Sequence, residues 1–398
     1  MSIGTRTLQS TAITTVALTT AAALTLGLAG TATADTAPTT NNVGIELPVP
    51  PGTGWSEPAA VNDKGVIVGF IIGSTDRHQA VPVRWNADLS IAALPLLPGD
   101  PSGEATGVNG DGTAIGFSGT HPARWSPAGT VSALPLLPGD TYGRASGINS
   151  AGTVIGSSQG NGHWHAVAWT PDGTAVPLAP LAGDTETTAV SVNSSGTVAG
   201  FSSNPAGTLA HAVIWGPDGT PTALDAAGDY NATYASQIND AGTVIGRGNP
   251  AGDGNFPWHS VIWTADGSVT DLGPLTYAQA VNSSGTVVGN QGSNQDAGAA
   301  SRWSPDGTRT ELGGQQTVAT AINDAGVAVG YSWNGIPDRE YRSAKRWNAD
   351  GTTTDLTVAN PQANTEALVI NGSGLIAGVD IVHPQPYSLQ HHAVIWKP

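Results

Sequence analysis

Short runs of alternating apolar and polar residues recur along most of the chain, separated by turns rich in glycine, asparagine, aspartate and proline. One complete unit spans 144–180 and contains four such runs, at 144–149, 153–158, 165–169 and 175–180. This alternation predicts β-strands, because successive side chains of a strand point to opposite faces of its sheet. Between the runs, "NSAG" and "TPDG" place glycine where a tight hairpin turn requires a positive φ. Each unit therefore predicts a four-stranded antiparallel sheet.

Eight such units follow one another. The asparagine that opens the first turn of each unit lies at Asn62, Asn109, Asn149, Asn193, Asn239, Asn282, Asn323 and Asn371. A tryptophan ends the third run of each unit, at Trp85, Trp125, Trp169, Trp215, Trp263, Trp303, Trp347 and Trp396. The spacing of 40–48 residues is typical of propeller blades. The sequence predicts an all-β, eight-bladed β-propeller of four-stranded antiparallel blades, in which the asparagines and glycines are turn residues.

The positions of proline and of the chain ends predict how the blades are ordered and closed. Proline cannot donate to a strand ladder, so Pro95, Pro135 and Pro177 place the fourth strand at the outer edge. The segment "GIELPVPPG" at 44–52 resembles the fourth-strand phrase "ALPLLPGD", and the chain stops after the third-strand phrase "HAVIW" at 392–396. We expect the N-terminal strand to complete the last blade, closing residues 43–398 into one domain.

Residues 1–34 have a different character. Arg6 precedes an apolar run rich in threonine and alanine, and "ATA" at 32–34 matches a signal-peptidase site. This pattern predicts a signal peptide at 1–34 and a flexible tail at 35–42, with a membrane anchor as the alternative. No later stretch approaches the length of a transmembrane helix, so we expect an exported protein without membrane insertion.

Charge and cysteine content narrow the range of partners. The chain has 30 acidic and 14 basic residues, a formal net charge of −16. Such a surface repels phosphate backbones, which argues against nucleic acid as a partner. The chain has no cysteine, so an exported protein of this kind must be stabilised by core burial and ring closure instead of disulfides.

The connections between strands divide between the two faces of the predicted disc. The Asn-x-x-Gly and Pro-Asp-Gly turns lie on one face and hardly vary; we call it the turn face. The second-to-third and fourth-to-first connections lie on the other face and vary in length; we call it the variable face. Because ligand sites gather on variable loops held by a rigid scaffold, we expect function on the variable face.

Four tryptophans fall outside the repeat pattern, in or beside the variable-face connections: Trp55, Trp164, Trp258 and Trp333. Aromatic rings there can stack on sugar rings or anchor a protein partner. The alternative is that they fill gaps between loops.

A second set of candidates lies where each innermost strand begins, one residue before a small side chain. Around the ring these mouth positions hold Glu366, Glu57, Glu104, Arg144, Thr188, Tyr234, Tyr277 and Val318. If they line the mouth of the channel, three adjacent carboxylates, an arginine and two phenols share a cleft suited to acid–base chemistry. The alternative is a solvated rim without a function.

Catalytic and metal-binding motifs are otherwise missing from the sequence. "GSSQG" at 156–160 fits G-x-S-x-G, but Ser158 follows a strand that enters a loop, whereas a nucleophile elbow leads into a helix. Gly-Asp turns at Asp100, Asp140, Asp184 and Asp229 offer one oxygen ligand per loop, too few for Ca²⁺, and are interpreted as turn caps. A histidine four residues before the tryptophan in five units is interpreted as strand packing. The sequence predicts no catalytic residue, no metal and no cofactor.

The repeat "A-x-x-[VI]-N-x-x-G-[TV]-x-x-G" followed by "H-A-V-x-W-x-x-D-G-T" resembles the HAF-repeat extracellular family of bacteria. "HAVIW" at 211–215 and 392–396 corresponds to the family's His-Ala-Phe strand, with valine in place of phenylalanine. The resemblance implies an exported, propeller-like bacterial protein and supplies no catalytic residues.

These patterns favour a secreted, non-enzymatic, lectin-like binding module that recognises a glycan or cell-surface component through the variable face. A more specific version is a subunit of a larger secreted assembly. Two alternatives stay open: a carbohydrate-active hydrolase or lyase that uses the mouth carboxylates, and a protein-interaction scaffold.

Overall fold

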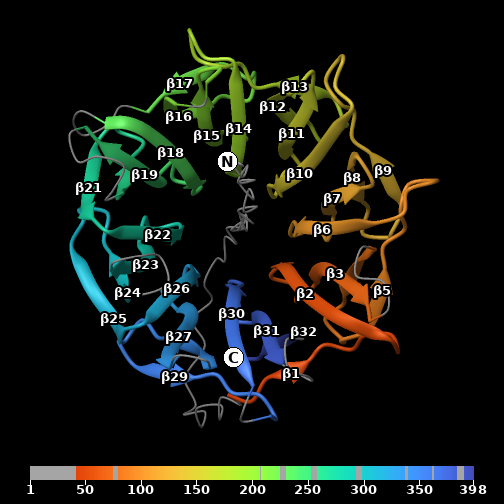
Figure 1. The fold of residues 1–398 in the computed structure, drawn as a ribbon, viewed down its shortest axis with the longest axis vertical. Helices are drawn as coiled ribbons and strands as arrows, with labels where there is room; N and C mark the ends of the chain where they lie inside the picture. Colours follow the sequence, from red (N-terminus) through yellow and green to blue (C-terminus); the bar gives the residue numbers. More distant parts are fainter. Residues whose placement is uncertain are drawn as a thin grey trace, which may run out of the picture.

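Eight blades surround a central channel in the computed structural model, as the repeats predict (Figure 1). The structure describes residues 42–74, 79–206, 208–224, 230–251, 258–292, 298–336, 339–360, 363–382 and 390–398. The expected signal peptide and all but the last residue of the expected tail lie outside the described residues. No helix within the described ranges is long and apolar enough to cross a membrane.

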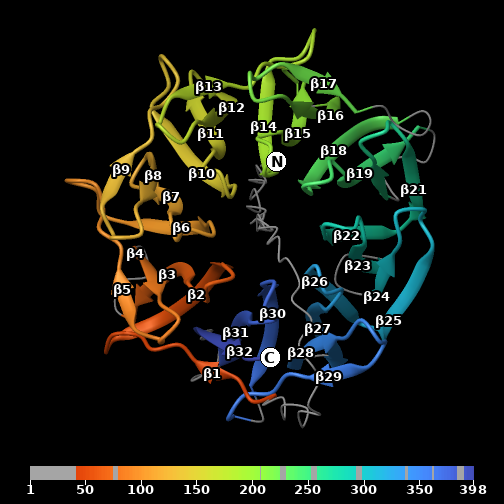
Figure 2. The same ribbon diagram turned by 180° about the vertical axis from the view of Figure 1, so that it is seen from behind.

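Each blade is an antiparallel sheet (Figures 1 and 2). In blades 1 to 7 the strands follow chain order from the channel outward, and in blade 8 the first strand of the chain lies outside the last three. Blades 1 to 4 comprise β2 to β5 (Thr53–Val61, Ile67–Gly73, Ala80–Trp85, Ile91–Ala93), β6 to β9 (Gly103–Val108, Ala114–Ser118, His121–Trp125, Val131–Ala133), β10 to β13 (Tyr142–Ile148, Val154–Gly160, His163–Trp169, Ala175–Pro177) and β14 to β17 (Glu186–Val192, Val198–Ser203, Ala210–Trp215, Pro221–Ala223). Blades 5 to 8 comprise β18 to β21 (Tyr230–Ile238, Val244–Pro250, His259–Trp263, Val269–Pro274), β22 to β25 (Thr276–Val281, Val287–Gly292, Gly298–Trp303, Arg309–Gln315), β26 to β29 (Thr317–Ile322, Ala328–Ile336, Arg339–Trp347, Thr353–Asp355) and β30 to β32 (Asn364–Ile370, Ile376–Val382, Gln390–Trp396) with β1 (Ile45–Glu46).

The N-terminal strand completes blade 8, which confirms the expected closure. β1 pairs antiparallel with β32, the last strand of the chain. Leu47, directly after β1, is 1% exposed and packs in the core shared by blades 8 and 1. Gly44 also donates a backbone hydrogen bond to the carbonyl of Thr357, beyond the outer strand of blade 7. The first described residues therefore connect blades 7, 8 and 1.

The repeated asparagines form a closed ring of hydrogen bonds near the turn face. Each donates from Nδ2 to the backbone carbonyl of the next repeat asparagine, at distances from 2.7 Å (Asn239 to Asn282) to 3.5 Å (Asn109 to Asn149). The eighth bond, from Asn371 to Asn62, closes the circle. The ring consists of Asn62, Asn109, Asn149, Asn193, Asn239, Asn282, Asn323 and Asn371.

The same side chains also close their own turns, as predicted. Asn239 Oδ1, for example, accepts a hydrogen bond from the backbone N–H of Thr243 at 2.8 Å. Each asparagine is at most 6% exposed, so both ends of the amide are satisfied inside the protein. The repeated phrase therefore sets both the turn within a blade and the contact between blades.

A second inter-blade contact lies nearer the variable face. In six interfaces, a third-strand backbone N–H three residues before the repeat tryptophan donates to a Ser or Thr hydroxyl on the first strand of the next blade. The pairs are Ala393 with Ser56, Ala166 with Thr187, Ala212 with Thr233, Ser260 with Thr276, Ala300 with Thr317 and Ala344 with Thr365.

The other two interfaces change both partners together. The donor positions hold Pro82 and Pro122, which lack an N–H, and the hydroxyl positions hold Gly103 and Gly143. A Cβ on Gly143 would lie 3.2 Å from Pro122 Cδ and 2.6 Å from Leu136 Cδ2. In these two interfaces, proline therefore replaces the N–H donor and glycine replaces the hydroxyl acceptor, and the two changes occur together.

The repeat tryptophans pack between blades, as expected from their spacing. All eight are at most 2% exposed. Several also donate from Nε1 to a carbonyl beside the outer strand of the preceding blade: Trp85 to Pro48, Trp125 to Pro95 and Trp169 to Pro135. Buried indoles thus connect each blade to the one before it at the outer wall.

Candidate functional site

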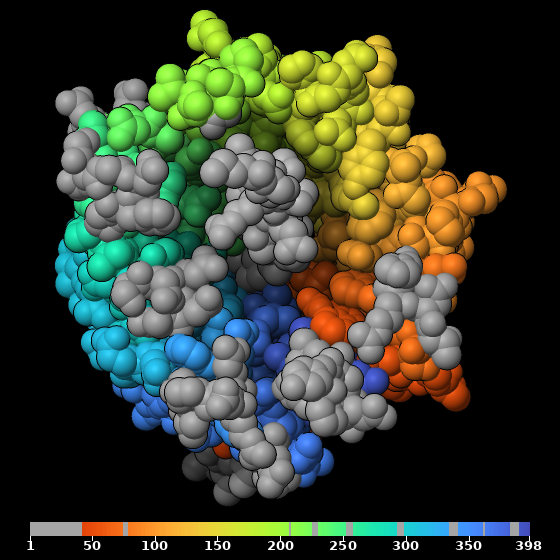
Figure 3. Space-filling model, viewed as in Figure 1, coloured from red at the N-terminus to blue at the C-terminus, as the bar shows by residue number. Residues whose placement is uncertain are grey.

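The mouth positions lie on the first strands of their blades, the strands that surround the channel (Figure 1). The space-filling view shows the blades following one another around the centre in chain order (Figure 3). The mouth side chains extend toward the preceding blade in the cases where contacts are defined. The Arg144 guanidinium lies over the Phe117 ring of blade 2, with 3.2 Å between Cζ and the ring centroid. Tyr234 of blade 5 packs edge-on against Phe201 of blade 4, with 5.0 Å between ring centroids. The mouth is therefore assembled from side chains of neighbouring blades.

Two of the three mouth carboxylates already have partners. Glu57 Oε2 accepts a hydrogen bond from Trp55 Nε1 at 3.1 Å and lies 3.3 Å from His391 Nδ1. The Trp55 and His391 rings stack with centroids 3.7 Å apart. Glu366 is 9% exposed, and its Oε1 lies 2.6 Å from Arg342 Nη1. Glu366 is thus held between blades 7 and 8. The expectation that it shares a cleft with the other two carboxylates is wrong.

Glu104 differs from the other two. It is half-buried, and no described residue donates a hydrogen bond to it. Burial raises the pKa of its carboxyl group, the nearby Arg144 guanidinium opposes this rise, and the Glu57 carboxylate adds to it. Arg144 Nη1 is buried and has no hydrogen-bond partner among the described residues. The two side chains therefore keep hydrogen-bonding capacity that the described protein does not use.

Aromatic side chains continue this site outward. Arg144 Cζ lies 5.0 Å from the centroid of Tyr142, and the Tyr142 ring meets Trp164 edge-on at 5.8 Å. Trp164 is 36% exposed, among the most exposed large apolar side chains described. We call Glu104, Phe117, Tyr142, Arg144 and Trp164 the blade 2–3 patch. It offers a carboxylate, a guanidinium and an exposed indole side by side.

A second patch with a similar composition lies on the other side of blade 4. The exposed Arg247 guanidinium lies 5.3 Å from the Tyr234 ring and 5.0 Å from the Trp258 ring. Tyr234 and Trp258 meet edge-on at 5.8 Å. We call Phe201, Tyr234, Arg247 and Trp258 the blade 4–5 patch.

Two further predicted candidates, like Trp55, Glu57 and Glu366, join neither patch. Trp333, on β27, has its Nε1 buried without a hydrogen-bond partner among the described residues, and its backbone N–H donates to Gln316 at 2.7 Å. Tyr277 lies on β22 opposite Asn290 of β23. The structure thus brings Trp164 together with Arg144 and Glu104, and Trp258 together with Tyr234.

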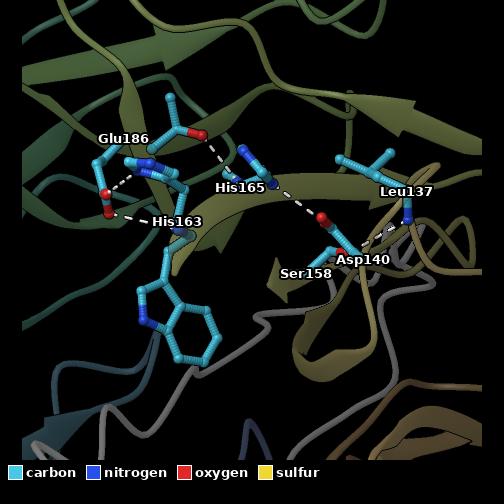
Figure 4. A network of polar contacts seen from close by, with 9 residues as sticks. Leu137, Asp140, Ser158, His163, His165 and Glu186 are labelled. Atoms are coloured by element: carbon cyan, nitrogen blue, oxygen red, sulfur yellow. Dashed lines mark hydrogen bonds and ion pairs between the residues drawn. The ribbon is translucent and has the colours of Figure 1, made fainter. Parts of the chain in front are cut away.

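A polar network supports the blade 2–3 patch from the fourth-to-first connection (Figure 4). Asp140 Oδ2 accepts a hydrogen bond from Ser158 Oγ at 2.5 Å and lies 3.1 Å from His165 Nδ1. Ser158 Oγ in turn accepts from the backbone N–H of Leu137 at 3.2 Å. Ser158 is fully buried in this chain of bonds and lies within β11, whereas the sequence placed it where a strand enters a loop.

Parts of the same network reappear in the neighbouring blades. Asp100 Oδ2 accepts from Ser118 and lies 3.7 Å from His121, and Asp184 lies 3.1 Å from His211. These aspartates therefore contact the histidines of the next blade, a role that their interpretation as turn caps did not include. Asp229, the fourth predicted turn cap, lies outside the described residues.

Glu186 positions the strand that carries the exposed tryptophan (Figure 4). Its Oε1 lies 2.9 Å from His163 Nδ1, and its Oε2 accepts a hydrogen bond from the backbone N–H of Trp164 at 3.4 Å. Glu186 comes from blade 4 and His163 from blade 3, so two blades hold Trp164 in place.

Sequence reasoning missed the second-strand members of these patches, and Tyr142 on the first strand of blade 3. Phe117 and Arg247 lie opposite the mouth residues Glu104 and Tyr234 in the strand register. These members could have been found from the sequence by listing, for each unit, the second-strand residue that pairs with the mouth residue. The residues at this second-strand position are Phe70, Phe117, Ser157, Phe201, Arg247, Asn290, Tyr331 and Val379.

Replacement of Glu104 by Gln is expected to stabilise the protein at neutral pH. Because burial raises the pKa of this carboxyl group in the folded state, the folded protein binds more protons than the unfolded chain. Its stability therefore falls as pH rises from the ordinary carboxyl pKa through the raised pKa. Urea unfolding should show a higher midpoint for Glu104→Gln at pH 7 and no difference at pH 3.

The exposed Glu311, which pairs with Arg309 on the outer strand of blade 6, gives the control. Glu311→Gln should leave the midpoint unchanged or slightly lowered at pH 7. A Glu104→Gln midpoint below that of the wild-type protein at pH 7 would mean that ionised Glu104 stabilises the fold, contrary to the geometry.

No protein-family model and no curated protein matches this chain. Solved structures match along most of it. A puromycin hydrolase is 14% identical over 85% of this chain and 60% of its own, with a TM-score of 0.51. A catalytically inactive virginiamycin B lyase from Staphylococcus aureus with quinupristin is 11% identical over 89% and 98%, with a TM-score of 0.48. An oligogalacturonate lyase in complex with manganese is 12% identical over 91% and 94%, with a TM-score of 0.49.

The likeness to the puromycin hydrolase shows the propeller fold alone. The chain spans 60% of the length of the puromycin hydrolase, and the identities are too low to carry residue roles. The function therefore has to be argued from the patches themselves.

Proposed function

We propose that this protein is a secreted, non-enzymatic binding module that recognises a saccharide at the blade 2–3 patch. One observation carries the proposal: Glu104 and Arg144, close together at the channel mouth, both lack hydrogen-bond partners among the described residues. Arg144 Nη1 is buried, and a buried donor without a partner is costly unless a ligand satisfies it.

The chemistry of the patch suits a sugar better than an apolar ligand. A pyranose ring presents hydroxyl groups at its edge and C–H groups on its faces. Glu104 can accept hydrogen bonds from hydroxyl groups, and Arg144 can donate to ring or hydroxyl oxygens. The indole of Trp164, fixed through Glu186, offers an apolar surface beside them.

A glycan array followed by calorimetry tests the proposal. For a glycan that binds the wild-type protein, we expect Glu104→Gln and Trp164→Ala each to weaken binding by about tenfold, the loss of one or two good contacts. Leu209→Ala removes another exposed apolar side chain of the variable face, on blade 4, and should leave affinity unchanged. Equal affinities for all variants, or an array without any bound glycan, would contradict the proposal.

A carbohydrate-active hydrolase or lyase is the second candidate, favoured by one observation. The Glu57 carboxylate lies near enough to contribute to the raised pKa of Glu104, and two neighbouring carboxyl groups can serve as general acid and general base. Measuring new reducing ends or double bonds in a bound polysaccharide separates the two. Turnover that Glu104→Gln abolishes while binding persists would establish the enzyme.

Export and partners are also proposals. We propose that residues 1–34 direct secretion from a bacterial cell and that a cell-surface glycan is the ligand, in keeping with the HAF-repeat resemblance. N-terminal sequencing of protein from the culture medium tests the first part. If a partner protein binds and saccharides do not compete with it, the protein-interaction scaffold is favoured instead.

A further inference from the structure

We infer that the saccharide bound at this mouth is anionic, and that Arg247 in the blade 4–5 patch binds its carboxylate group. This inference rests on the proposed function, because it extends the same site across blade 4 and names the class of sugar. Arg247 belongs to none of the repeat motifs, and its neighbours in the patch are aromatic.

The rings around Arg247 fix its guanidinium group. Arg247 lies opposite Tyr234 in the β18–β19 register, and its Cζ lies 5.3 Å from the Tyr234 ring and 5.0 Å from the Trp258 ring. Phe201 of blade 4 packs edge-on against Tyr234 at 5.0 Å and supports it from the neighbouring blade. A guanidinium held on aromatic faces keeps its N–H edge available for a planar, bidentate partner.

The guanidinium group of Arg247 has no polar partner among the described residues. It makes neither an ion pair nor a side-chain hydrogen bond there, whereas Arg342 pairs with a carboxylate and Arg302 donates to a backbone carbonyl. The chain holds 30 acidic residues for 14 basic ones, so acidic partners are plentiful. An exposed guanidinium, held in place and surrounded by rings in so acidic a protein, is suited to an external anion.

The two patches lie on either side of blade 4. Arg144 belongs to β10 and Tyr234 to β18, and β14, the innermost strand of blade 4, runs between these strands (Figure 1). Thr188 is the mouth residue of that strand and carries no charge. A linear oligosaccharide that crosses β14 could therefore contact Glu104 and Trp164 with hydroxyl groups and a ring face, and Arg247 with a carboxylate. A uronic acid supplies all three chemical groups.

The carboxylate is the anion that best matches this geometry. Its two oxygens lie in one plane and accept two parallel N–H bonds from a guanidinium group. A uronate sugar differs from its neutral counterpart only at C6, where a carboxylate replaces a hydroxymethyl group. The contribution of Arg247 can therefore be measured by comparing two sugars that are otherwise the same.

The experiment uses calorimetry with two matched pairs of probes: β-1,4-linked mannuronate and mannose hexasaccharides, and β-1,4-linked glucuronate and glucose hexasaccharides. For the pair that binds, we expect the wild-type protein to prefer the uronate by about tenfold, which is the strength of one charge-assisted bidentate contact. Arg247→Gln should abolish this preference and leave the affinity for the neutral sugar within twofold. Arg247→Lys, which keeps the charge without the planar fork, should retain only part of the preference.

Arg309→Gln is the matched control, since it removes the same charge from the outer strand of blade 6. It should leave the preference at its wild-type value. A wild-type protein that binds the neutral hexasaccharide as tightly as the uronate would overturn the inference while the proposed function stands. A preference that survives in Arg247→Gln would remove Arg247 from the site. Binding of neither pair, with other glycans bound on the array, would also overturn the inference alone.

Discussion

A chain that starts at Val49 is expected to be less stable by about 4–6 kcal/mol than one that keeps residues 42–48. Loss of Leu47 exposes core surface, worth about 2 kcal/mol for one leucine side chain. Loss of β1 removes its pairing with β32, and loss of Pro48 leaves the buried Trp85 indole without its acceptor. Each lost or unsatisfied hydrogen bond adds about 1 kcal/mol or more.

Urea unfolding followed by tryptophan fluorescence measures the loss, since Trp85 and Trp396 lie beside the missing segment. A synthetic peptide of residues 42–52, added in trans, should bind the truncated protein and restore the midpoint. The same peptide with Leu47→Asp is the control and should restore nothing. An unchanged midpoint in the truncated protein would show that the N-terminal strand does not close the ring.

Asn239→Asp is expected to destabilise the protein by about 3 kcal/mol, although aspartate is an excellent turn residue. An aspartate at this position can still accept the hydrogen bond from Thr243, so the turn itself is preserved. It cannot donate to the carbonyl of Asn282, and it places a charge at a site that is 2% exposed. Burial of a carboxylate beside a carbonyl oxygen costs more than the lost bond alone.

The exposed Asn231, on the same strand, gives the matched control. Its Nδ2 lies 3.5 Å from the carbonyl of Pro250, and Asn231→Asp introduces the same charge at the surface. We expect its unfolding midpoint to stay near that of the wild-type protein. If Asn239→Asp were as stable as Asn231→Asp, the repeated asparagine would act in the turn alone.

Much of the fold could be predicted from the sequence because its determinants are local and repeated eight times. The glycine of the first turn marks a hairpin in every unit. In Gly152, for example, φ is 88°, the positive value that such a turn needs. The likeness of residues 44–52 to the fourth strands predicted the closure, which the pairing of Ile45 with Ile395 confirms. Neither prediction required knowledge of how blades lie against one another.

Contacts between blades could not be predicted in the same way. The Nδ2 of Asn62 reaches a carbonyl 47 residues later, and Arg84 donates to the carbonyls of Gly112 and Pro127 in the next blade. Such bonds depend on the angle and offset between two sheets, which no strand period encodes. The sequence therefore identified Asn62 as a turn residue and was silent on its second role.

The candidate site shows the same limit. Trp55, Trp164, Trp258 and Trp333 are equivalent in the sequence, as aromatic residues outside the repeat, but their surroundings differ. Trp55 stacks on His391, Trp258 lies beside Arg247, and Trp164 is left exposed. Partners from distant segments decide which ring is available to a ligand, and these partners follow from the strand register.

The matched change of proline with glycine bears on how such a chain grows by duplication. Half of each inter-blade contact lies in the third strand of one repeat and the other half in the first strand of its successor. A copy of the repeat containing Pro122, inserted before the one containing Thr233, would leave a threonine hydroxyl facing a residue without an N–H. A duplication avoids this mismatch when the copied segment contains both halves of an inter-blade contact. The segment that can be copied without loss is therefore the junction between two blades, and not a single blade.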